Sequence, residues 1–74
     1  MNFNLLKKKF IAKINNNKNI REVNVYLAMA LLDSSQYDVA KAVLELLTVE
    51  GFLEKRGKVW IIKTREYDDD NDEN

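Results

Sequence analysis

The chain contains no cysteine, no histidine and no proline, and only two of its 74 residues are glycine. Without Cys there can be no disulfide or thiolate nucleophile, and without His there is no imidazole base and no ordinary zinc site. A chain of this length has room for one domain, and a domain of about 60 residues buries only about 60% of its unfolded surface. Helix packing or association with another chain must therefore supply the stability.

Long hydrophobic runs are also missing. The longest stretch without a polar residue is the eight-residue segment from Val25 to Leu32, whereas a membrane-spanning helix needs about 20 residues. Lys7, Lys8 and Lys9 are not followed by the apolar block of a secretion signal. We therefore expect an intracellular, cytoplasmic protein.

The charges are segregated, although the formal net charge is zero. Residues 1–65 hold all 12 basic residues and six acidic ones, a net charge of +6, whereas residues 66–74 hold six acidic residues and no basic one, a net charge of −6. No apolar residue follows Tyr67. Such a segment cannot bury enough surface to order itself, so we predict one domain over 1–65 and a disordered acidic tail over 66–74.

The spacing of apolar residues predicts helices over 3–15, 21–32 and 35–50. Asn15 to Asn17 ends the first helix and Asp33 to Ser35 ends the second. Ser35 with Asp38 resembles a capping box for the third helix, and Gly51 suits a left-handed residue at its end. The three apolar stripes are Phe3-Leu6-Phe10-Ile14, Ile20-Val23-Leu27-Ala30-Leu31 and Val39-Val43-Leu46-Leu47.

After Gly51 the apolar period changes from about 3.6 residues to two. Residues 52–55 and 58–64 flank Arg56-Gly57 and are rich in β-branched and aromatic residues, which predicts a β-hairpin. Trp60 alternates with Val59 and Ile61, so we assign it to the core or a sheet face rather than to base stacking.

The segment from Val23 to Lys63 resembles the winged helix-turn-helix family. The features that carry the resemblance are the short break at Asp33-Ser34-Ser35, a third helix opening with Ser-Gln-Tyr, and the run Leu46-Leu47-Thr48-Val49-Glu50-Gly51-Phe52-Leu53-Glu54-Lys55-Arg56-Gly57. The resemblance implies an α+β, mostly helical domain in which the third helix enters the DNA major groove and the hairpin forms a wing. A short extended stretch often precedes the second helix in this family, and Asn19-Ile20 could supply it.

On a helical wheel, an arc next to the third apolar stripe carries no acid, and Asp38 and Glu45 lie to its side. An acid-free arc suits a helix that approaches phosphates. Gln36 can pair with adenine, Lys41 with guanine or phosphate, and Ala40 can contact a thymine methyl group. A solvated helix face is the alternative. The predicted contacts of this region are Ser34 and Ser35, as phosphate donors, and Gln36, Tyr37, Ala40, Lys41, Leu44 and Thr48.

The hairpin tip places Lys55, Arg56 and Lys58 around one turn. In the family such a tip lies on the phosphate backbone or in the minor groove. The alternative is a solvated turn whose cations keep a sheet edge soluble. Lys63 and Arg65 could extend the same basic patch.

The second helix is too apolar for a single buried face, because Val25, Met29 and Leu32 lie off its main stripe. Such a surplus usually marks a partner surface. A homodimer through this helix and the first would pair two third helices on a palindromic site. The alternative is that a compact three-helix core covers the second helix on two sides.

We expect no enzymatic activity, cofactor, metal or small-molecule ligand, since the sequence offers no nucleophile–base pair, phosphate loop or metal-binding cluster. The function expected is a sequence-specific, double-stranded DNA-binding transcription regulator. The chain also resembles the very short winged-helix regulators of viruses and plasmids of thermophilic archaea in its size, its lack of Cys, its richness in Lys and Asn and its lack of a ligand domain. The alternative is a winged-helix protein-interaction module, because fold alone does not imply function. RNA binding is less favoured because few aromatic residues are available on a sheet.

The charge segregation gives a first test. A chain that ends at Arg65 should keep its helical circular dichroism and thermal midpoint, and it should bind DNA at least as tightly as the intact chain because −6 of charge is removed. Titration of both chains against mixed duplex DNA at several salt concentrations measures this. Loss of the fold on truncation would contradict the assigned domain boundary.

Overall fold

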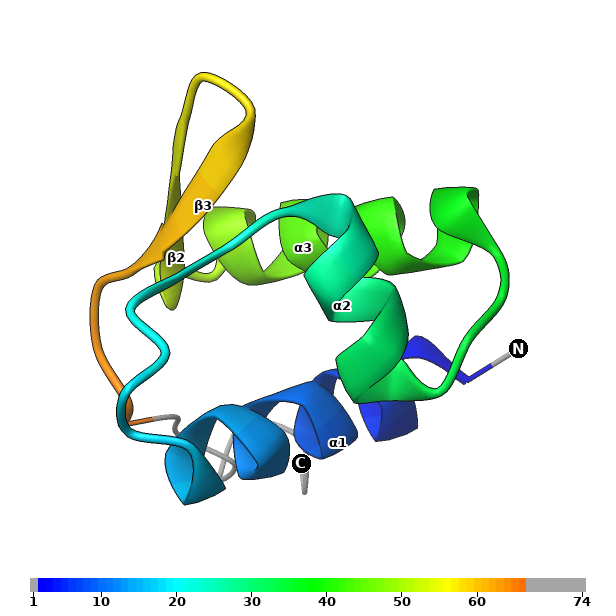
Figure 1. The fold of residues 1–74 in the computed structure, drawn as a ribbon, viewed down its shortest axis with the longest axis horizontal. Coiled ribbons are helices and arrows are strands. Elements are labelled where there is room, and N and C mark those ends of the chain that lie inside the picture. The colour runs from blue at the N-terminus through cyan, green and yellow to red at the C-terminus, as the bar shows by residue number, and fades with distance from the viewer. Residues whose placement is uncertain (1, 67–74) are drawn as a thin grey trace.

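Three helices and a three-stranded antiparallel sheet form the fold in the computed structural model, which describes residues 2–66 (Figure 1). The fold class is therefore confirmed, an α+β domain with a winged-helix-like layout. Met1 and residues 67–74 lie outside the described residues, and with them all of the predicted tail except Glu66. The elements, in chain order, are α1 (Phe3–Asn16), β1 (Glu22–Val23), α2 (Val25–Leu32), α3 (Tyr37–Val49), β2 (Leu53–Arg56) and β3 (Val59–Ile62).

The first helix forms nearly as predicted. The Asn2 side chain accepts hydrogen bonds from the backbone N–H groups of Asn4 and Leu5 at 3.0 and 3.3 Å, which caps the N-terminus of α1. Phe10 and Ile14 are fully buried. The helix ends at Asn16, one residue later than predicted.

The second helix begins at Val25 and not at residue 21 as predicted. The Asn24 side chain accepts a hydrogen bond from the backbone N–H of Leu27 at 2.8 Å and caps the helix there. The residues before Asn24 belong to β1, a short strand that the apolar spacing did not reveal. The extended stretch expected at Asn19-Ile20 therefore lies slightly later in the chain.

The third helix is shorter at its start than the predicted 35–50, and the predicted capping box is wrong. Gln36 is the N-cap residue and makes no capping hydrogen bond with its side chain. Ser34 Oγ accepts from the backbone N–H of Gln36 at 3.1 Å, so it holds the turn rather than the helix. At the other end, Gly51 has φ +87° as predicted, and the backbone N–H of Phe52 donates to Leu47 at 3.0 Å.

The hairpin pairs Arg56 with Val59 and Lys55 with Trp60, which makes Gly57-Lys58 its loop. The predicted turn at Arg56-Gly57 is thus one residue too early. Gly57 has φ +63°, and a positive φ at only the first loop position is what a type II′ turn requires. The central strand of the sheet is β3, because β1 pairs with its other edge through Glu22–Ile61 and Val23–Trp60.

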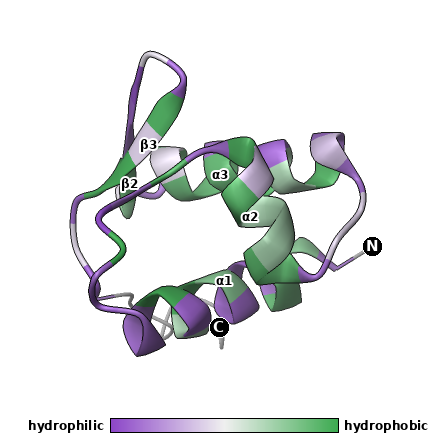
Figure 2. Cartoon of the chain, in the orientation of Figure 1, coloured by the Kyte–Doolittle hydropathy of each residue, from purple (hydrophilic) through white to green (hydrophobic). Residues whose placement is uncertain are grey.

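Helix α2 lies between the other two helices (Figure 1). Its side chains are apolar along most of its length (Figure 2). Val25, Ala28 and Leu32 are buried, and Leu27, Met29 and Leu31 are partly buried against the same core. The alternative stated above, in which a compact three-helix core covers α2 on two sides, is therefore the observed arrangement. None of the helices in residues 2–66 combines the length and apolar character that a membrane span requires.

One charged side chain is buried with the core. Lys7 on α1 is only 5% exposed, and its ammonium donates to the Glu50 carboxylate at the C-terminal end of α3. A buried ammonium is stable only with such a partner. The ion pair therefore fixes the distance between α1 and the end of α3.

Arg65 fixes the other end of the domain. Its guanidinium donates to the backbone carbonyls of Ile14 at 2.6 Å, Lys18 at 3.1 Å and Ile20. These carbonyls belong to the last turn of α1 and to the segment that leads to β1. Arg65, which comes shortly after the sheet in the chain, thus links the sheet to the end of α1.

Glu50→Gln should lower the free energy of unfolding by about 1–3 kcal/mol, because it removes the carboxylate that faces the buried Lys7 ammonium. The figure is below that of a fully buried pair because the Glu50 side chain is 35% exposed. Urea denaturation would measure it. Glu45→Gln is the matched control, since Glu45 is exposed on the same helix; equal effects of the two changes would contradict a structural role for the pair.

Arg65→Lys should destabilise the fold by about 1–2 kcal/mol, because an ammonium cannot reproduce the planar fork that reaches three carbonyls. Arg21→Lys, an exposed Arg nearby, should change little. Thermal unfolding followed by circular dichroism compares the two. If Arg65→Lys left the stability unchanged, the carbonyls would be satisfied equally well by an ammonium group.

Candidate functional site

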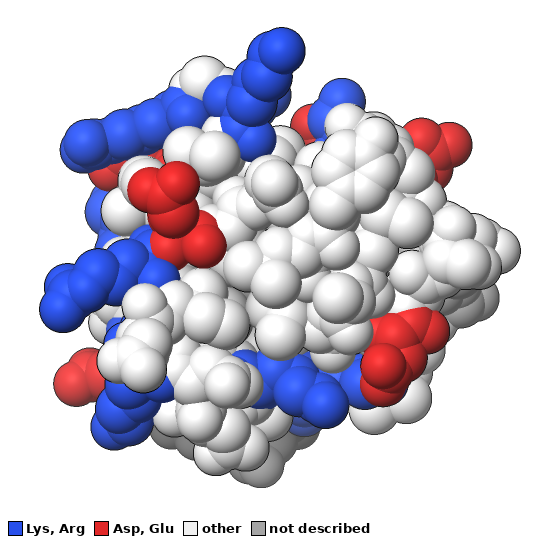
Figure 3. Space-filling model, viewed as in Figure 1, with Lys and Arg blue, Asp and Glu red and all other residues white. Residues whose placement is uncertain are grey.

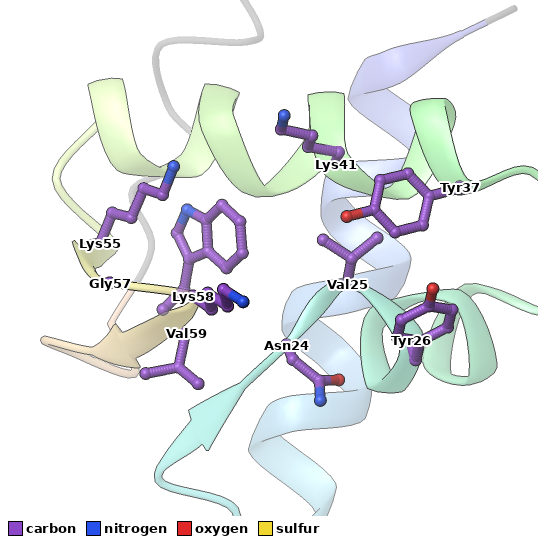
Figure 4. Close-up of a pocket in the computed structure, with 10 residues that line it drawn as sticks. Asn24, Val25, Tyr26, Tyr37, Lys41, Lys55, Gly57, Lys58 and Val59 are labelled. Atoms are coloured by element: carbon purple, nitrogen blue, oxygen red, sulfur yellow. The ribbon is translucent and has the colours of Figure 1, made fainter.

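A cleft opens between the hairpin and the N-terminal parts of α2 and α3, with a volume of about 500 Å³ (Figure 4). We call it the lysine cleft, because three of its lining residues are Lys and none is Asp or Glu. The lining residues are Asn24, Val25, Tyr26, Tyr37, Lys41, Lys55, Gly57, Lys58, Val59 and Trp60.

The strand register explains why two hairpin lysines reach the lysine cleft. Lys55 pairs with Trp60 across the sheet, so both side chains lie on the face that covers the core. Trp60 is 2% exposed, as its core assignment predicted, and Lys55 Nζ lies 5.2 Å from the centre of its ring. Lys58 comes from the tight loop. The hairpin therefore directs two of its three predicted cations into the cleft.

Arg56 points the other way. It is the neighbour of Lys55 on β2, so its side chain lies on the opposite face of the sheet. There its Nε donates to the Glu54 carboxylate at 2.9 Å. The three tip cations predicted as one group are thus divided between two faces.

Helix α3 contributes Tyr37 and Lys41 to the lysine cleft, but its orientation differs from the predicted one. Ala40 and Leu44 are fully buried, so their predicted contacts with bases are wrong. The buried arc is Ala40, Val43, Leu44 and Leu47, whereas Val39 is only partly buried and Leu46 is exposed. Both arcs are apolar at helical spacing, and packing against α2 and the sheet selects between them.

The rotation of α3 also buries part of the predicted acid-free arc, which still contains no acid. Asp38, Glu45 and Val49 are exposed on the outward side of the helix, with Val49 at 85%. Thr48 is partly buried, and its hydroxyl donates to the Leu44 carbonyl at 2.7 Å. Freedom from acids therefore describes the lysine cleft and not the outward face of α3.

The predicted phosphate donors lie in a different depression. Ser34 and Ser35 share it with Leu5 and Leu6 of α1, and it is not the lysine cleft. Gln36, the predicted adenine contact, also lines this depression. The turn there is held by Asp33, which adopts φ +53° at the end of α2 and accepts from Lys9 Nζ at 3.1 Å. The hydrogen bond from Lys9 and the charges of Lys9 and Lys13 lower the pKa of Asp33. The contribution of this pair to stability is therefore present above the ordinary Asp pKa and is lost as the pH falls through the lowered one.

Tyr26 and Asn24 are cleft residues that sequence reasoning missed. Tyr26 is 69% exposed and packs edge-to-face against Tyr37, 43% exposed, with ring centres 5.5 Å apart. A Tyr in the first turn of an otherwise aliphatic helix was the available signal. Both tyrosines lie across the cleft from Lys55 and Lys58 (Figure 4).

The surface charges follow this arrangement. In Figure 3, Lys and Arg gather over the hairpin, while the face over α2 carries no charge. Lys7 and Arg65 make internal contacts, so the predicted extension of the basic patch to Arg65 is wrong. Lys41, Lys55 and Lys58 remain together as lining residues of the lysine cleft.

The predicted dimer seam needs a similar correction. Val25 and Leu32 are 5% and 2% exposed, so they belong to the core of the single chain and cannot form a seam. Met29 is partly buried against the same core. Association of two copies through Met29 and α1 stays a prediction.

Comparison with known proteins does not assign a family. No protein-family model matches the chain, and no curated protein or solved structure matches it either. The functional conclusion therefore depends on the lysine cleft itself.

Proposed function

We propose that the chain is a double-stranded DNA-binding transcription regulator that holds the phosphate backbone at the lysine cleft. The observation that supports this most directly is the convergence of Lys41, Lys55 and Lys58, from a helix and a hairpin, on one concave surface without an acid. Cations that neutralise phosphates release counterions, and this term supplies most of the non-specific affinity for DNA.

The N-terminus of α2 adds to this field. Asn24, Val25 and Tyr26 line the lysine cleft, so the positive end of the α2 macrodipole lies beside the three ammonium groups. Helix N-termini favour phosphate for this reason. Two independent sources of positive potential, the ammonium groups and the N-terminus of α2, thus make the cleft suited to an anion.

Recognition of the DNA bases rests on fewer side chains than the family resemblance implied. With Ala40 and Leu44 buried, the candidates for base contacts are Gln36, Tyr37 and Lys41 at the start of α3. Lys41 can donate to guanine, and Gln36 can pair with adenine. Glu45, farther along the helix, would have to stay clear of the phosphates.

A second candidate function has its own observation. Leu46 and Val49 are exposed on the outward side of α3, next to Asp38 and Glu45. An exposed apolar stripe with acidic neighbours suits a protein partner better than a nucleic acid. A protein-interaction module would use this face and would not need the lysine cleft.

Lys58→Ala should weaken binding to unrelated duplexes alike and reduce the slope of log affinity against log salt by about one unit, as expected for one lost phosphate contact. Lys63→Ala is the control, because Lys63 is exposed near the hairpin but outside the lysine cleft. Lys41→Ala should instead weaken binding to a preferred site by about 1–3 kcal/mol. Salt-dependent fluorescence anisotropy gives all three quantities.

Equal effects of Lys58→Ala and Lys63→Ala would contradict the lysine cleft as the contact surface. Failure of the intact chain and of the chain ending at Arg65 to bind duplex DNA at any salt concentration would favour the protein-interaction module.

A further inference from the structure

The lysine cleft has room for more than contact with a phosphate backbone. Its volume of about 500 Å³ falls within the range of about 300–1,000 Å³ that is typical of small-molecule sites. A duplex is convex, so its phosphates can meet the ammonium groups at the rim but leave the floor empty. A single nucleotide outside the base stack could enter.

The two walls of the cleft differ in chemistry, as the phosphate and the base of a nucleotide do. Lys55 and Lys58 form the hairpin wall, and Tyr26 and Tyr37 stand across from them (Figure 4). Cations are suited to the phosphate, and exposed aromatic rings are suited to stacking on a base whatever its identity. The tyrosine pair therefore distinguishes this cleft from a merely basic patch.

Trp60, which lines the cleft, carries a donor that no described residue uses. Trp60 Nε1 is buried and has no hydrogen-bond partner among the described residues. A buried indole N–H normally has one. A phosphate oxygen or a base carbonyl that entered the cleft could accept from it, with Lys55 moving from the Trp60 ring toward the phosphate.

We propose that the lysine cleft binds one unpaired nucleotide of a DNA strand, so that the preferred ligand is a duplex with a single-stranded extension rather than a blunt duplex. The phosphate lies among Lys41, Lys55 and Lys58, and the base stacks on the Tyr26–Tyr37 pair. This inference rests on the proposed DNA binding and specifies the form of DNA. Because the same cleft holds the DNA backbone in the proposed function, the nucleotide is assigned to a DNA strand rather than to a free mononucleotide.

Trp60 provides the measurement, because it is the single tryptophan of the chain. The full chain is titrated with a blunt duplex, with the same duplex carrying a single-stranded extension, and with thymidine monophosphate, while Trp60 emission is followed. The extended duplex should bind about 5- to 150-fold more tightly than the blunt one, as expected for one stacked base, and should change the emission. The blunt duplex should bind without that change.

Variants separate stacking from charge. Tyr26→Ala should remove most of the preference for the extension and leave the affinity for the blunt duplex unchanged, whereas Tyr26→Phe should retain the preference because the ring remains. Lys63→Ala should lower both affinities alike or not at all, since it lies outside the cleft.

Each outcome distinguishes the two proposals. Equal affinity for blunt and extended duplexes, or equal loss of both in Tyr26→Ala, overturns the nucleotide site and leaves DNA binding intact. Thymidine monophosphate binding as tightly as the extended duplex overturns the assignment to a DNA strand. No binding of any DNA form overturns both proposals.

Discussion

The burial of α2 is the constraint on which the rest of the structure depends. An eight-residue helix without a single charged side chain cannot persist in water unless other elements cover it. Helix α1 covers one side and α3 the other, and the Lys7–Glu50 pair joins these two helices where they meet. The apolar surplus that suggested a partner surface is thus largely used inside the chain. The lysine cleft exists because the N-terminal turn of α2 lies beside the hairpin and lines the cleft together with it.

The sequence predicted elements well where one local pattern dominated. Helix α1 has a single apolar stripe and an Asn cap, and Gly51 and Gly57 mark two of the three described positions with positive φ, the third being Asp33. The pattern failed where two solutions were equally apolar. Helix α3 can bury either Val39 with Leu46 or Ala40 with Leu44, and only its contacts with α2 and the sheet decide between them. The strand β1 has two residues, too few for a period, and forms because β3 offers it an edge.

The candidate site was less accessible to sequence reasoning than the fold. The sequence assigned Lys41 to the third helix and Lys55 with Lys58 to the hairpin tip, and the structure brings all three to the lysine cleft. By contrast, Lys7 pairs with a residue 43 positions away and Arg65 with carbonyls 45 to 51 positions away. The amino-acid composition counts each of these cations as one positive charge and does not distinguish between them. Tertiary contacts divide them into those that hold the fold together and those that remain available to a ligand.

The anchoring of Arg65 determines where the chain leaves the domain. Its guanidinium holds the end of the sheet beside the last turn of α1, whereas the Gly57-Lys58 loop lies at the far end of the hairpin (Figure 1). Anything joined after Glu66 therefore starts from the side of α1, away from the mouth of the cleft. A fusion partner or surface-immobilisation tag joined directly to Glu66 would start away from the tyrosine and lysine walls, while one inserted at the hairpin would obstruct them.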